Sequence, residues 1–152
     1  MNPGIVPLWS ADWAWGLPLI LLTVVIHAYS LGRLDKEVTA RISSAGRSRP
    51  RSSASMFVIG GTALSATILH GVEGAIWAGA YRLLGALPEI KSAMLYSLSA
   101  MTSYGHENLH LAPHWQMMGA LEALNGLILF GLTTAFLFTV MQRAWPHASQ
   151  QQ

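Results

Sequence analysis

The sequence predicts an all-α integral membrane protein with three transmembrane helices and a re-entrant half-helix between the second and the third. Of its 152 residues, 52% are hydrophobic and only 11% are charged, a lower share of charge than soluble domains carry. Several apolar segments also reach the roughly 20 residues that a helix needs to cross a bilayer. The chain has no cysteine, which excludes disulfide frameworks and thiolate metal sites.

The N-terminal segment, residues 1–31, is predicted to hold the first transmembrane helix. Residues 13–31 contain no Asp, Glu, Lys or Arg. A cleaved signal peptide is the competing interpretation, but the chain start lacks a basic region and Asp12 precedes the apolar stretch. We therefore expect this helix to be retained in the membrane.

Residues 32–55 are predicted to form a basic cytoplasmic linker, because they are rich in Arg, Ser, Gly and Pro. Loops with an excess of Lys and Arg stay on the cytoplasmic side of a membrane. We therefore expect the N-terminus outside and the tail, residues 144–152, in the cytoplasm. A basic stretch beside membrane spans indicates topology rather than nucleic-acid binding. Its basic residues are Arg33, Lys36, Arg41, Arg47, Arg49 and Arg51.

Residues 56–84 and 117–141 are predicted to form the second and third transmembrane helices, with Trp77 and Trp145 as interface anchors. Residues 88–101 are too short to cross a bilayer and too apolar for a surface loop, which favours a re-entrant half-helix. Pro88 and Glu89 suit its first turn. The polar residues 102–105 interrupt the helix, so its negative end would stabilise cations there.

Three stretches between residues 55 and 143 carry a more specific pattern. They are Ala93-Met94-Leu95-Tyr96-Ser97, Tyr104-Gly105, and the run from Gly119 to Gly126 continued at 133–136. They resemble, in that order, the pore helix, the selectivity filter and the inner helix of the small bacterial ion channels built from two membrane helices and a pore loop.

The resemblance implies a potassium-channel-like homotetramer in the bacterial inner membrane. Its pore domain would be residues 56–143, with outer helix 56–84, pore helix 88–101, filter 102–105 and inner helix 117–141. Stacked backbone carbonyls from four copies would replace the hydration shell of a monovalent cation, potassium or sodium. The first helix, 1–31, lies outside the resemblance, and no other cofactor is implied.

The filter departs from the family pattern, Thr-Val-Gly-Tyr-Gly, since this sequence reads Met101-Thr102-Ser103-Tyr104-Gly105. Without a gap, Ser103 replaces the first glycine. With a deletion of one residue, Thr102 matches and that glycine is missing. A serine in a glycine conformation costs on the order of 1 kcal/mol. We therefore expect potassium to be distinguished from sodium less well than with the family motif.

Polar residues inside the predicted spans are candidates for function, because ionisable groups there face the protein interior or water. His70 and Glu73, one helical turn apart, either couple to protons or form a neutral pair that reaches Asn125 or Thr133 of the third span. Glu122 is predicted to brace the filter. The intramembrane polar candidates are His70, Glu73, Glu122 and Asn125.

His106 and Glu107 follow the filter and are predicted to lie at the pore mouth, with His110 and His114 nearby. Histidine titrates near neutrality, so these residues suit proton sensing, and a solvated loop is the alternative. Their spacing matches no compact zinc pattern, so no metal site is predicted. Gly126 is predicted to be a hinge of the inner helix, although close helix packing would also select glycine.

The sequence thus predicts a passive cation channel and no enzyme. A membrane-embedded enzyme needs convergent acids, bases or metal ligands, and only His70 with Glu73 comes near that. A non-conducting channel-like scaffold or partner subunit is the alternative function. Apart from further copies of the chain and membrane lipids, no partner is predicted.

Overall fold

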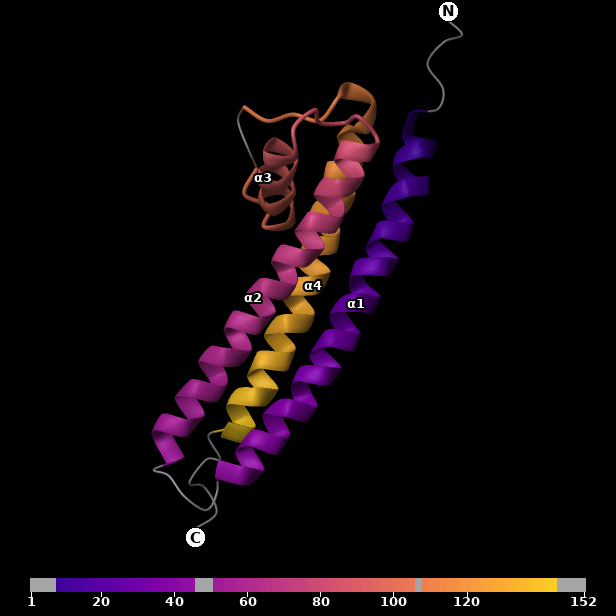
Figure 1. Ribbon diagram of the computed structural model, residues 1–152. Helices are drawn as coiled ribbons and strands as arrows, with labels where there is room; N and C mark the ends of the chain where they lie inside the picture. Colours follow the sequence, from indigo (N-terminus) through magenta and orange to yellow (C-terminus); the bar gives the residue numbers. More distant parts are fainter. Residues whose placement is uncertain (1–7, 46–50, 106–107, 145–152) are drawn as a thin grey trace, which may run out of the picture.

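The computed structural model describes residues 8–45, 51–105 and 108–144. Its elements are α1 (Leu8–Ala45), α2 (Arg51–Leu83), the short α3 (Ile90–Met101), a 3-10 turn (Pro113–Trp115) and α4 (Gln116–Ala144). Figure 1 shows α1, α2 and α4 as one elongated bundle, with α3 beside α2 and α4 near one end. Three segments are long and apolar enough to cross a membrane: Ser10–Ser43, Ser55–Leu83 and Pro113–Ala144. An all-helical architecture with three candidate spans is therefore confirmed for the described residues.

The described part of the predicted linker, residues 32–45 and 51–55, is helical, whereas its composition predicted irregular structure. α1 continues to Ala45 and α2 begins at Arg51. The apolar face of α1 continues beyond residue 31, the predicted end of the first span, since Leu31 and Val38 are both buried and lie two turns apart on one side of the helix. At this level Arg143 of α4 donates to Asp35 of α1 at 2.6 Å.

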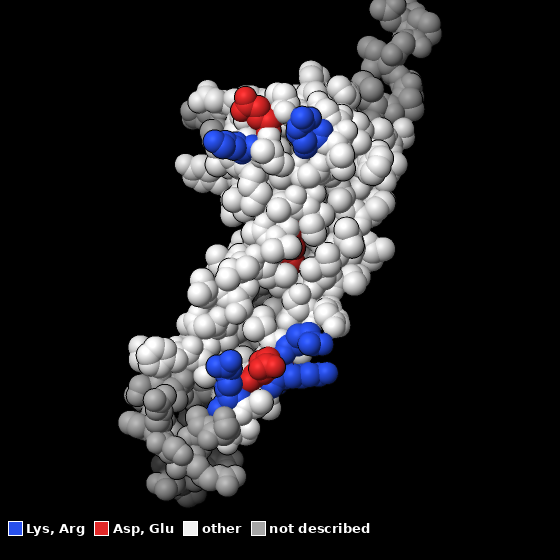
Figure 2. Space-filling model, viewed as in Figure 1, with Lys and Arg blue, Asp and Glu red and all other residues white. Residues whose placement is uncertain are grey.

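Polar and apolar side chains are distributed as lipid requires. Large apolar side chains are exposed on every long helix, as at Leu21 (67%), Leu64 (61%) and Leu127 (61%), whereas Glu73 and Glu122 are completely buried. Lipid solvates the first group and cannot solvate the second. On the face drawn in Figure 2, Lys and Arg gather toward the two ends of the bundle and leave the middle without a basic side chain.

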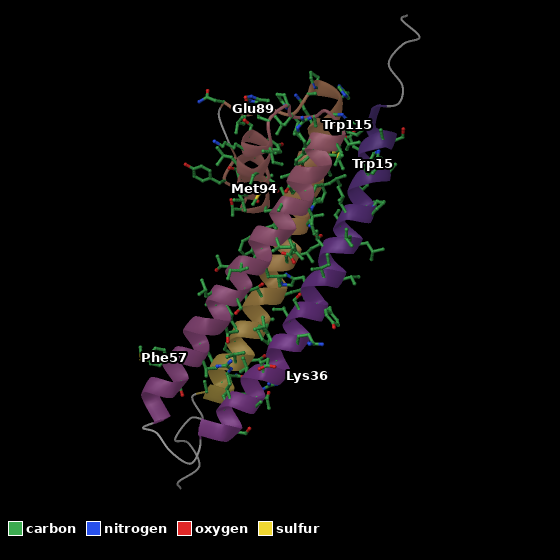
Figure 3. The ribbon with its side chains drawn as sticks, in the orientation of Figure 1. Trp15, Lys36, Phe57, Glu89, Met94 and Trp115 are labelled. Atoms are coloured by element: carbon green, nitrogen blue, oxygen red, sulfur yellow. The ribbon has the colours of Figure 1, made fainter. Side chains whose placement is uncertain are left out.

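Two tryptophans lie near the end of the bundle that carries α3. Figure 3 places Trp15 and Trp115 near that end, together with Glu89, and Lys36 and Phe57 toward the other. Trp77, by contrast, is fully buried against Tyr81, with ring centroids 6.1 Å apart. The prediction of Trp77 as an interface anchor is therefore wrong, because its side chain belongs to the core between the helices.

Many hydroxyl side chains bond within their own helix, which satisfies them without a partner from water. Each donates to the carbonyl four residues earlier, at 2.7–3.0 Å. This arrangement satisfies Ser and Thr both on the outer surface of a helix and, as at Thr62, where the side chain is buried. The residues are Thr62, Ser65, Thr67, Thr134 and Thr139.

The chain enters and leaves α3 at the same end of the bundle (Figure 1). The amide of Ala112, after α3, donates to the carbonyl of Ala86, before it, at 3.2 Å. α3 itself begins two residues later than the predicted 88–101, because Glu89 is extended (φ −115, ψ 135) and forms the N-cap. The short helix is thus a hairpin-like insertion between α2 and α4.

Small residues on α4 let α3 approach closely. A Cβ atom at Gly126 would overlap the backbone carbonyl of Met101, the last residue of α3, and one at Gly119 would overlap the hydroxyl of Tyr96. Backbone atoms cannot move aside as a flexible side chain can. Gly126 therefore has a packing role in this structure, and its role as a hinge remains a prediction.

Replacement of Gly126 by alanine should destabilise the fold, because the added methyl group pushes against the end of α3. Overpacking of this kind costs about 1–3 kcal/mol. Gly131→Ala is the matched control, since among the described residues no atom outside the adjoining turns of α4 lies within 4 Å of a Cβ there. Thermal unfolding of the purified protein in detergent should show a lower midpoint for Gly126→Ala alone. Equal midpoints would contradict the close packing described here.

Candidate functional site: the segment after α3 and the buried polar network

The predicted filter segment, Thr102–Gly105, folds back onto the end of α3. The amides of Ser103 and Tyr104 each donate to a last-turn carbonyl of α3 at 2.9 Å, and that of Gly105 does so at 3.4 Å. In a trans peptide the N–H group and the preceding C=O group point in opposite directions. The carbonyls of Thr102, Ser103 and Tyr104 therefore point away from α3, and no backbone amide of the described residues donates to them.

This segment also has an unusual backbone. Ser103 has a φ of 56 and Gly105 a φ of 72, both in the left-handed region. Glycine adopts this region freely, whereas a residue with a Cβ atom loses roughly 1–2 kcal/mol there. The side chain of Tyr104 is 85% exposed. The backbone of the segment is therefore strained at Ser103, and its polar residues are exposed in the single chain.

Glu122 of α4 links the helices behind this segment. One carboxylate oxygen accepts from the hydroxyl of Tyr81 of α2 at 2.6 Å. The other contacts the hydroxyl of Ser97 of α3, which also lies 2.8 Å from the carbonyl oxygen of Gly74. Glu122 and Ser97 are completely buried. A single carboxyl group therefore connects α2, α3 and α4, in the position expected of a brace.

A second group of buried polar residues, which we name the histidine cluster, consists of His27, His70, Glu73 and Thr133. His27 Nδ1 lies 2.8 Å from Glu73 Oε1, and His70 Nδ1 lies 3.3 Å from Glu73 Oε2. The hydroxyl of Thr133 lies 3.0 Å from His27 Nε2 and 3.1 Å from His70 Nε2. The four side chains form a closed ring of contacts between α1, α2 and α4.

Two further contacts attach α1 to α4. The side-chain amide of Asn125 donates to Thr23 Oγ1 at 2.8 Å. The backbone amide of Met118 donates to Asp12 Oδ1 at 3.0 Å, and Asp12 is 1% exposed. Met118 lies in the first turn of α4, whose amides have no partner within the helix. The first helix thus supplies a cap for the helix predicted to line the pore.

The structure joins some of the predicted site residues and separates others. His70 contacts Thr133 as proposed for a hydrogen-bonded pair, whereas Asn125 contacts α1 instead. His110 and His114 are exposed. Sequence reasoning missed His27, although an ionisable residue inside an apolar span is a signal of function. His106 and Glu107 lie outside the described residues.

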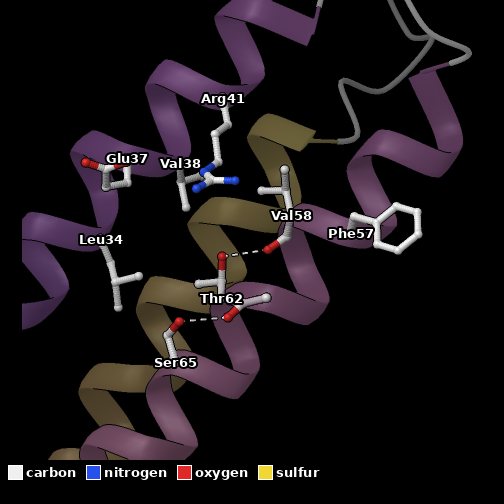
Figure 4. Close-up of a pocket in the computed structure, with 9 residues that line it drawn as sticks. Leu34, Glu37, Val38, Arg41, Phe57, Val58, Thr62 and Ser65 are labelled. Carbon is white, nitrogen blue, oxygen red and sulfur yellow. Dashed lines mark hydrogen bonds between the residues drawn. The ribbon is translucent and has the colours of Figure 1, made fainter.

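Two surface depressions flank these sites. One, of about 510 Å³, lies beside the segment after α3 and is lined in part by Tyr96, Ser103 and His110. The other, of about 330 Å³, lies between α1 and α2 near the opposite end. Figure 4 shows Arg41 above this second depression, while Thr62 and Ser65 donate to carbonyls of their own helix.

Replacement of Glu122 by alanine should destabilise the protein, because the buried hydroxyl of Tyr81 loses its acceptor and Ser97 keeps only the carbonyl of Gly74. Each unsatisfied group costs about 1–3 kcal/mol. Glu89→Ala is the control, since the Glu89 side chain is exposed and makes no capping hydrogen bond. Chemical unfolding in mild detergent should show a loss for Glu122→Ala only. A stability equal to that of the control would rule out the bracing role.

Comparison with known proteins gives no family for this chain. No family model, no curated protein and no solved structure matches it. The functional assignment therefore rests on the residues and contacts described above.

Proposed function

We propose that the chain is one subunit of a homotetrameric, passive channel for monovalent cations, with residues 102–105 as its selectivity filter. The observation that carries this proposal is the direction of the carbonyls of Thr102, Ser103 and Tyr104, which follows from the amide hydrogen bonds to α3. In a four-fold ring, such carbonyls would surround the axis and replace the hydration shell of an ion. The negative end of α3 would add to this attraction.

The exposed polar surface of the single chain supports assembly. Polar backbone that faces lipid has no partner, so irregular segments at membrane depth are found only where protein or water covers them. The segment after α3 is such a segment, and the depression of about 510 Å³ lies directly beside it. Neighbouring copies would cover the depression, and a water-filled axis would solvate the polar backbone of the segment.

The proposed orientation follows from the basic residues. The end of the bundle that holds the junction between α1 and α2 would face the cytoplasm, since Arg and Lys concentrate there. The end with α3 would face outside, and the host membrane would be a bacterial inner membrane. In this orientation the filter opens toward the external side, where potassium or sodium would enter.

Reconstituted protein should conduct. Rubidium uptake into liposomes that contain the purified full-length protein should exceed uptake into empty liposomes. Gly105→Ala should abolish the flux, because it introduces a Cβ atom at a φ of 72 within the filter. Gly85→Ala is a matched control with the same kind of strain, since Gly85 has a φ of 67 in the turn before α3.

The controls separate the alternatives. Flux that survives in Gly105→Ala would exclude residues 102–105 as the filter. Folded wild-type protein without any flux would favour a non-conducting scaffold or partner subunit, which is the alternative function. Uptake must be normalised to the amount of folded protein, because both variants place a side chain in a left-handed conformation.

Ion selectivity should be weak in the wild type and respond to residue 103. Ser103→Gly should relieve the strain at a φ of 56 and increase the preference for potassium if the family alignment has no gap. A glycine inserted before Tyr104 should have that effect if the alignment has a deletion. Bi-ionic reversal potentials should be measured for the wild type and for both variants to compare their selectivity for potassium over sodium. Strong potassium selectivity in the wild type would contradict the argument.

A further inference from the structure

The histidine cluster contains two buried atoms that face each other and have no hydrogen-bond partner in the described part of the chain. Among the described residues, His70 Nδ1 and Glu73 Oε2 are buried and make no hydrogen bond, and they lie 3.3 Å apart. Glu73 is completely buried, and the His70 side chain is 10% exposed. Groups of this kind inside a protein are almost always satisfied, so their juxtaposition requires an explanation.

A count of hydrogens shows why these two atoms are left over. Thr133 has one hydroxyl hydrogen, which can serve the Nε2 atom of only one histidine. If His27 donates from Nδ1 to Glu73 and accepts from Thr133 at Nε2, a neutral His70 keeps a hydrogen bond to Thr133 only by donating from Nε2. Its Nδ1 lone pair then faces a carboxylate oxygen. A positive charge between these two atoms would remove the repulsion.

We propose that His27, His70 and Glu73 bind a divalent transition-metal ion of the zinc class inside the helix bundle. One ligand atom from each residue lies within 4.8 Å of the other two, close enough for a single ion to contact all three. Two imidazole nitrogens with one carboxylate oxygen form a ligand set that suits zinc and related ions. This inference concerns a site distinct from the filter and does not depend on conduction.

Thr133 completes the site as a positioning residue. If both imidazoles bind the metal through Nδ1, both carry their hydrogen on Nε2. Both Nε2 atoms lie within 3.1 Å of the Thr133 hydroxyl oxygen, whose two lone pairs can accept both hydrogens. Outer contacts of this kind fix the tautomer and the orientation of metal-binding histidines. With a metal ion bound, each Nδ1 lone pair would have the metal as its partner, and each Nε2 hydrogen would have the Thr133 oxygen as its acceptor.

Metal titration of the full-length protein in detergent tests the proposal. After chelator treatment, the wild type should bind one equivalent of Co²⁺, with visible absorption bands that differ from those of Co²⁺ in buffer, and Zn²⁺ should displace it. Thr133→Val should weaken the affinity by about 10- to 100-fold. Folded wild-type protein that binds neither ion would overturn the proposal. A proton shared by His70 Nδ1 and Glu73 Oε2 would then account for their proximity.

A ligand exchange separates coordination from a purely structural role. His27→Cys should still bind Co²⁺ and should add a near-ultraviolet charge-transfer band, because thiolate is a zinc-type ligand and the chain has no other cysteine. His114→Cys, at an exposed histidine, should leave the Co²⁺ spectrum as in the wild type. Binding of Co²⁺ to His27→Cys without the new band, or unchanged binding in Glu73→Gln, would place the metal elsewhere and overturn the assignment.

Discussion

The structure depends on one constraint: a polar group buried between apolar helices must find its partner within the protein, because lipid offers none. Glu73 and Glu122 show how the chain meets this requirement. Each is completely buried. Glu122 contacts Tyr81 of α2 and Ser97 of α3, whereas Glu73 contacts His27 of α1 and, in its own helix, His70, which contacts Thr133 of α4. The resulting contacts specify which helices are neighbours, a specificity that apolar packing alone supplies poorly in a membrane.

The same contacts make α1 part of the unit that holds α3. Thr23 of α1 bonds to Asn125 of α4, and the next residue, Gly126, packs against the carbonyl of Met101 at the end of α3. One turn of α4 thus lies between the first helix and the segment proposed as the filter. The first helix, which lies outside the resemblance, therefore packs directly against the helix predicted to line the pore.

Local features were predictable from the sequence, whereas partners across helices were not. Long runs without charge define the spans, and Pro88 with the polar residues 102–105 brackets α3 well. Helical spacing shows that His70 and Glu73 share a face, but it cannot show that this face meets His27, which is 46 residues from Glu73. Composition likewise suggested a linker after residue 31. It does not show that Leu31 and Val38 are buried on one side of a helix that continues to Ala45.

A structure of the full-length protein in lipid nanodiscs tests the pore proposal most directly. We expect a four-fold ring in which residues 102–105 of each copy face the axis and their carbonyls surround bound cations. The Glu122 contact to Ser97 should lie behind them, on the side away from the axis. A monomer, an antiparallel dimer, or a ring in which residues 102–105 face lipid would contradict the account.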